Sequence, residues 1–159
     1  MSFSLAGQYI ERLTLDGAAN INGTGNSLNN TITGNTGSNV LNGGTGDDTL
    51  TGEAGVDFFV FNTALNAATN VDTITDFTVN VDKIRLENAI FAAVGADLTA
   101  GEFVANTTGT ATTSTQNILY DTTDGRVFYD PDGNGAQARV HFATLDPGLA
   151  LDHLDFVVI

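Results

Sequence analysis

A nine-residue repeat between residues 25 and 60 constrains the fold of this chain more than any other feature of its sequence. In four consecutive units the first residue is always Gly, the fourth is Gly in all but the first unit, and the sixth is Asn or Asp. The eighth residue is always large and apolar: Ile32, Leu41, Leu50 and Phe59. A unit this short cannot bury its apolar residue alone, so the units must stack on one another.

Each unit is predicted to form a Gly/Asn/Asp-rich turn followed by a three-residue strand whose middle residue is apolar. Because successive units lie on alternate sides, units two apart stack at the spacing of parallel strands, ~4.8 Å. The alternative is that Asn22-Gly23 and Asn42-Gly43 are ordinary hairpin turns between antiparallel strands. The strict nine-residue recurrence favours an all-β fold, a right-handed parallel β-roll over residues 25–84 that includes a closing strand.

The sequence on either side of the roll is different in character. Residues 1–24 have strand-like apolar spacing but no Gly-Asp turn, and we expect metal-free lead-in coils there. Residues 85–159 are predicted to form a β-rich C-terminal cap with one or two short helices. The expected elements are a closing strand within 71–77, a helix within 86–94, and strands within 117–121, 126–130 and 138–144.

The charge of the chain points to a cation as its partner. Five Lys and Arg stand against 19 Asp and Glu, which gives a formal net charge of −14, and no Lys or Arg occurs between residues 13 and 82. This balance argues against binding to nucleic acids or anionic membranes, both of which require basic patches. The absence of cysteine excludes disulfides, thiolate metal sites and cysteine nucleophiles.

The turn from Gly43 to Asp48 carries the strongest chemical signal. Its glycines permit left-handed backbone, so carbonyl groups can point into the turn, and Asp48 adds a carboxylate. Calcium takes such oxygen ligands at ~2.3–2.6 Å, so an ion midway between stacked turns reaches both. Carboxylates ~5 Å apart repel by roughly 3 kcal/mol at an effective dielectric near 20, which a bound cation reverses. The alternatives are solvated turn aspartates and, at Asn30 and Asn39, neutral caps.

The repeats, the segment from Val71 to Ile84 and the ending Asp155–Ile159 resemble the C-terminal part of RTX (repeats-in-toxin) proteins, the hemolysin-type calcium-binding repeat family. Serralysin-like metalloproteases and rhizobial exoproteins carry similar regions. The resemblance implies several Ca²⁺ ions, bound by turn carbonyls and by carboxylates at the sixth column and in the closing segment. The candidate ligand residues are Gly34, Gly37, Asn39, Gly43, Gly44, Gly46, Asp48, Gly52, Gly55, Asp57, Asp72 and Asp82. Asp76 is expected to cap a turn instead.

The resemblance also implies a function. It predicts a non-catalytic, monomeric module of a larger exoprotein that folds on binding Ca²⁺ outside the cell. The last residues, Asp155–Ile159, resemble the uncleaved signals of type I secretion substrates, which makes a type I exporter the expected partner. Residues 1–13 lack the pattern of a secretory signal peptide, and no apolar run is long enough for membrane insertion. The expected localisation is therefore extracellular.

Particular residues suggest three other functions. Thr31, Thr33, Thr49 and Thr51 project on one face of adjacent coils, which suggests an adhesin-like surface for glycan or ice.

The segment 130–135 matches the first half of an EF-hand loop, but its twelfth position is His141 instead of Glu, so a tight turn is favoured over a second calcium site. A hydrolase could use a carboxylate pair, yet the two histidines lie in no zinc motif, and we expect no enzyme. The carboxylates considered for a hydrolase pair are Asp121, Asp124, Asp130 and Asp132.

Overall fold

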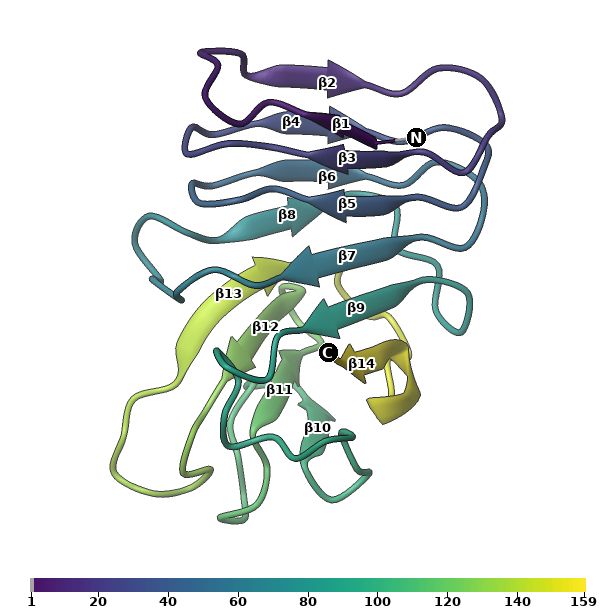
Figure 1. Ribbon diagram of the computed structural model, residues 1–159. Helices are drawn as coiled ribbons and strands as arrows, with labels where there is room; N and C mark the ends of the chain where they lie inside the picture. Colours follow the sequence, from purple (N-terminus) through teal and green to yellow (C-terminus); the bar gives the residue numbers. More distant parts are fainter. Residues whose placement is uncertain (1) are drawn as a thin grey trace.

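The structure is a computed structural model that describes residues 2–159, and it consists of two sheets that face each other along a stack of coils (Figure 1). The six-stranded sheet has the order β1 (Ser2–Ser4), β3 (Asn22–Thr24), β5 (Val40–Asn42), β7 (Phe58–Phe61), β9 (Lys83–Leu86) and β14 (Phe156–Val158). The eight-stranded sheet has the order β10 (Phe103–Asn106), β11 (Ile118–Asp121), β12 (Arg126–Tyr129), β13 (Val140–Thr144), β8 (Asp72–Ile74), β6 (Thr49–Thr51), β4 (Thr31–Thr33) and β2 (Arg12–Thr14).

Consecutive strands of the repeat region belong to opposite sheets, so each strand pairs with the strand two places away in sequence. Thr31 of β4 lies opposite Thr49 of β6, and Val40 of β5 lies opposite Phe58 of β7, in both cases in parallel and eighteen residues apart. The predicted parallel β-roll is therefore confirmed. The eighteen-residue offset places the turns of every second unit directly on one another.

The three-residue strands of the roll bury one apolar side chain each. In β4, β5 and β6 the central residues Ile32, Leu41 and Leu50 are 0% exposed, while their strand neighbours are partly exposed. The four-residue strand β7, next to the cap, buries Phe59 and the two residues after it. Burying each such side chain contributes roughly 1.5–3 kcal/mol. Because so little apolar surface is available per coil, the turns contribute a large share of what determines whether the roll is stable.

Both sheets continue into the C-terminal cap. Strand β13 pairs in parallel with β8, and β14 pairs in parallel with β9, at the lower end of the stack in Figure 1. The cap has a fuller core than the roll, in which the Phe91 ring packs edge-on against Tyr129 at 5.2 Å and Phe142 at 5.1 Å. The last coil is thus covered by the cap, whereas β1 and β2 end the two sheets at the other side.

The helix expected within residues 86–94 does not form. Strand β9 extends through Leu86, and the following residues make turns in which Ile90 and Phe91 both donate their N–H groups to the Glu87 carbonyl. This segment tucks Phe91 and Val94 into the cap core, which turns achieve as well as a helix. Among residues 2–159 the helical structure is limited to the 3₁₀ turn η1 (His153–Asp155), and no helix is long and apolar enough to cross a membrane.

Candidate metal centre

The turns of the repeats stack along the two edges of the roll. On one edge the turn 25–30 is followed by the turn 43–48, and on the other edge the turn 34–39 is followed by the turn 52–57. The sixth residue is Asn in the first turn of each edge and Asp in the second. We therefore call 25–30 and 34–39 the Asn turns and 43–48 and 52–57 the Asp turns.

Two spaces between stacked turns matter on each edge. Before the Asn turns lie the lead-in turns, residues 5–11 and 15–21, which hydrogen bonds connect to residues 25–30 and 34–39, respectively. We call the space between a lead-in turn and its Asn turn the first gap. The space between an Asn turn and its Asp turn is the second gap.

Each second gap contains a carboxylate oxygen with no partner. Asp48 accepts a hydrogen bond at Oδ1 from the Asn30 backbone N–H at 2.6 Å, and Asp57 accepts one from the Asn39 N–H at 2.8 Å. The second oxygen, Oδ2, of both aspartates is buried without any hydrogen-bond partner. A buried anionic oxygen in this condition is costly unless a proton or a cation neutralises it.

Glycines form a cradle around these oxygens. A Cβ on Gly43 would overlap Asp48 Oδ2, and a Cβ on Gly52 would lie 2.5 Å from Asp57 Oδ2. A Cβ on Gly46 would lie 2.8 Å from the Leu28 carbonyl oxygen and one on Gly55 would lie 2.6 Å from the Gly37 carbonyl oxygen, and both glycines have φ in the left-handed region, +118° and +134°. Carbonyl and carboxylate oxygens therefore occupy positions that side chains at these glycines would otherwise fill. This donor set fits Ca²⁺, which prefers several hard oxygen ligands.

The aspartates that follow the Asp turns behave in two ways. Asp72 accepts a hydrogen bond from the Asp48 N–H at 3.2 Å and so extends the column of carboxylates on its edge. Asp82 has both oxygens engaged, by the N–H groups of Asp57 and Thr78. Asp76 caps the start of an Asp turn, because it accepts from the N–H groups of Gly52 and the next residue. The structure thus places Asp76 in the capping role expected for it.

Burial raises the pKa values of these carboxyl groups. Desolvation raises the pKa of Asp48 and of Asp57 to about 6, although the hydrogen bonds from Asn30 and Asn39 oppose it. The pKa of Asp72 rises to about 8, first because of burial and second because of the charge of Asp48. Without a cation, the folded roll therefore holds protons at pH values where the unfolded chain has lost them.

This difference predicts how the calcium-free fold responds to pH. Because the folded pKa values lie above the unfolded ones, the calcium-free roll should be most stable below about pH 4 and lose stability as pH rises through about 6 and then 8. Far-UV circular dichroism of dialysed, calcium-free protein between pH 4 and pH 8 measures this. The β-signal should fall with rising pH, and a rise over that interval would contradict the raised pKa values.

The repeat region also matches a known family. Residues 24–59 match the profile described as the RTX calcium-binding nonapeptide repeat (4 copies). Over these residues the chain is similar to an array of RTX repeats. RTX repeats form a structural calcium-binding module that is typical of secreted proteins, and the β-roll with its oxygen-lined second gaps has the architecture expected of one. No curated protein matches the chain.

The four repeats do not form four turns of the same backbone conformation. In the fourth column Gly46 and Gly55 have left-handed φ, whereas Gly37 does not, and Gly44 in the second column is left-handed as well. In the Asn turns the sixth-column amide oxygen is already satisfied: that of Asn39 accepts from the Asn35 N–H at 2.8 Å. Of the predicted ligands, Gly34, Gly37 and Asn39 border a second gap through their backbones, because the Asn39 side chain donates to the Ile21 carbonyl on the other side of its turn. The unpartnered charge comes from the Asp-turn side.

The other metal signal of the sequence forms a connection between β12 and β13. Asp130 Oδ1 accepts from the Asp132 N–H at 3.4 Å, and Asp132 Oδ2 accepts from the Gln137 N–H at 3.1 Å, while Asp132 Oδ1 is buried without a partner. His141 is instead bonded within its own strand, to the Ala143 carbonyl at 2.9 Å. Across residues 2–159 no group of three or more His, Cys, Asp or Glu side chains is gathered for a metal.

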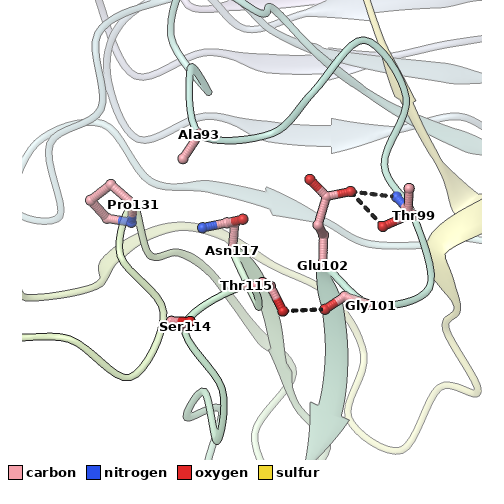
Figure 2. A pocket seen from close by; sticks show the side chains of 8 residues that line it. All are labelled: Ala93, Thr99, Gly101, Glu102, Ser114, Thr115, Asn117 and Pro131. Carbon is pink, nitrogen blue, oxygen red and sulfur yellow. Dashed lines mark hydrogen bonds between the residues drawn. The ribbon is translucent and has the colours of Figure 1, made fainter.

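A pocket of about 580 Å³ lies in the cap, at the start of strands β10 and β11 (Figure 2). Its lining carries one carboxylate, Glu102, which accepts hydrogen bonds from the Thr99 N–H at 2.8 Å and from its hydroxyl at 2.6 Å (Figure 2). The described residues that line it include neither histidine nor any of the four aspartates considered for a glycosidase pair. The pocket therefore gives the hydrolase alternative no support.

The threonines on the outer face of the eight-stranded sheet form a row, the threonine face, that spans more strands than the repeat sequence predicts. Besides the pairs on β4 and β6, Thr14 of β2 lies opposite Thr33, and Thr73 of β8 lies opposite Thr49. The hydroxyls of Thr51 and Thr75 hydrogen-bond to each other at 2.7 Å. A face for glycan or ice would therefore have four neighbouring strands instead of two.

Proposed function

We propose that this chain is a calcium-binding RTX module that folds when it binds Ca²⁺ outside the cell and that belongs to a larger exoprotein. The observation that carries the proposal is the pair of buried, unpartnered oxygens, Asp48 Oδ2 and Asp57 Oδ2, each in a cradle of glycine backbone. One ion in each second gap would satisfy them. The family match ends at residue 59, so the wider likeness to serralysin-like proteins remains a prediction.

The residues of each second gap have separate roles. The aspartate holds its Asn turn through Oδ1 and directs Oδ2 to the ion, while the glycines let backbone carbonyls approach from both turns. Calcium supplies the positive charge that the chain lacks between residues 13 and 82. Asp72 and Asp82 extend the two carboxylate columns into the next coil, where we propose that they add ligand oxygens or charge.

For export, we propose that Asp155–Ile159 are read by a type I exporter before they fold and pack against the roll afterwards. In the folded chain Asp155 is buried and the β14 backbone pairs with β9, so the whole segment is available as an extended, unpaired chain only before it folds. Low calcium in the cytosol keeps the roll open. Higher calcium outside then drives folding, because the ion binds selectively to the native state. The module acts as a monomer and has no catalytic role.

The metal proposal is tested by comparing two adjacent carboxylates of one turn. Asp48→Asn keeps the acceptor for the Asn30 N–H but removes the charge, so it should weaken calcium binding by about tenfold or more. Asp47→Asn is the control, because Asp47 is exposed and its one acceptor role, to the Val71 N–H, is retained by Asn. Isothermal titration calorimetry measures both. Equal weakening in the two variants would mean that the ion is not held by Asp48.

A further inference from the structure

The second column of the repeats separates the Asn turns from the Asp turns. This column is Asn26 and Asn35 in the Asn turns, and Gly44 and Glu53 in the Asp turns. Gly44 and Glu53 have left-handed backbone, with φ of +99° and +69°, whereas neither Asn26 nor Asn35 has positive φ. The same nine-residue pattern therefore takes two backbone forms, and the second residue distinguishes them.

In the Asn turns the second-column side chain reaches back into the first gap. Asn26 Nδ2 donates to the backbone carbonyls of Gln8 at 2.9 Å and Ile10 at 3.0 Å. On the other edge, Asn35 Nδ2 donates to the Ala19 carbonyl at 3.1 Å. The same arrangement thus occurs twice, on the two edges of the roll, between unrelated lead-in sequences.

The sixth column completes the arrangement. Asn30 Nδ2 donates to the Ile10 carbonyl at 3.1 Å, and Asn39 Nδ2 donates to the Ile21 carbonyl at 2.7 Å. The oxygen of each of these amides accepts from the second-column N–H of its own turn, at 2.8 Å on both edges. Every oxygen that these amides face in the lead-in turns is a carbonyl of the kind that would coordinate a metal.

A gap lined with carbonyl oxygens needs either a cation or hydrogen-bond donors to satisfy it. We propose that the amide pairs Asn26/Asn30 and Asn35/Asn39 take the place of calcium in the first gaps, so that the metal array begins at the second gaps. The neutral –NH₂ groups satisfy the carbonyls without charge, and the lead-in coils then need no ion. This inference rests on the proposed calcium-binding function and names the residues that decide which gaps bind metal.

The direct test converts one Asn turn into an Asp turn. Asn26→Gly/Asn30→Asp gives the turn 25–30 the same second and sixth residues as the turn 43–48. Calcium bound per chain, measured by equilibrium dialysis with atomic absorption, should rise by one ion over the wild type. Asn29→Asp is the control, because it adds the same charge to the same turn at an exposed position and retains its acceptor for the Asp47 N–H. An unchanged count in the folded double variant would overturn the inference.

The reverse exchange decides the matter even if that variant fails to fold. Glu53→Asn/Asp57→Asn installs the amide pair in a second gap whose second-column residue already carries a side chain, and it should bind one ion fewer than the wild type. Without calcium, it should retain more of the β-signal in far-UV circular dichroism than Asp57→Asn alone, since only the pair supplies donors to the facing carbonyls. Equal calcium-free signals would overturn the inference. A wild-type chain that binds no calcium would instead refute the proposed function.

Discussion

Removing calcium is expected to abolish most of the β-structure of residues 25–84. Strands β4, β5 and β6 bury one apolar side chain each, and both second gaps hold unpartnered carboxylate oxygens. At a calcium concentration ten times the Kd, each ion contributes about 1.4 kcal/mol to the free energy of unfolding. Two ions thus contribute about 2.8 kcal/mol of a total of about 5–15 kcal/mol, and their loss also leaves the buried carboxylates without a neutralising charge. Far-UV circular dichroism before and after addition of a chelator at pH 7.5 measures the loss.

The metal used to restore the fold gives the control for this experiment. Calcium in excess of the chelator should recover the spectrum, whereas magnesium should not, because Mg²⁺ demands shorter bonds in octahedral geometry and gives up its water reluctantly. A strongly β spectrum that the chelator leaves unchanged would show that the turns are stable without metal.

The second large effect is expected at Asp155, which ties the C-terminal segment to the last coil. Its side chain is 0% exposed, accepts from the N–H groups of Asn80 at 2.8 Å and Asp152 at 3.0 Å, and lies 3.7 Å from the Lys83 ammonium. Asp155→Ala leaves these donors without their acceptor and should lower the free energy of unfolding by about 3 kcal/mol. Urea denaturation in saturating calcium measures the change.

Leu154→Ala provides the comparison for Asp155→Ala. Leu154 is adjacent in sequence but 61% exposed, so its truncation should change the free energy of unfolding by less than about 0.5 kcal/mol. Similar losses in the two variants would contradict the anchoring role of Asp155. The result also bears on export, because deletion of residues 154–159 removes one of the two partner strands of β9 as well as the proposed signal. A failure of that truncated chain to appear outside the cell would therefore not by itself identify the signal.

The roll could be predicted from the sequence because the repeat is strict where it exists. The columns of Ile32, Leu41 and Leu50 place one inward residue on each strand, and the structure buries all three. Beyond the repeat the outcome is mixed: the strands expected within 71–77, 117–121, 126–130 and 138–144 form as β8, β11, β12 and β13, but one element does not. The helix expected near Phe91 was wrong, since an apolar run of that length can enter a core through turns as readily as through a helix.

The site was only partly visible in the sequence, for a related reason. Column similarity identifies Asp48 and Asp57 as the charged residues, and the structure gives each an unpartnered oxygen. Column similarity does not reveal that the Asn26 side chain points towards the lead-in turn, because that orientation depends on the sign of φ at one position. The long threonine face was also missed, since Thr73 lies 24 residues from its partner Thr49 instead of 18.

The alternation of strands between two sheets also limits how such a chain can change its length. Partners within the array lie eighteen residues apart, which is two repeats, so duplicating or deleting two repeats lengthens or shortens the stack and leaves every later strand in its own sheet. Inserting or losing a single repeat would send each later strand to the opposite sheet, and the cap would meet the wrong partners. Arrays of this kind should therefore grow and shrink in evolution by even numbers of repeats, unless the cap changes with them.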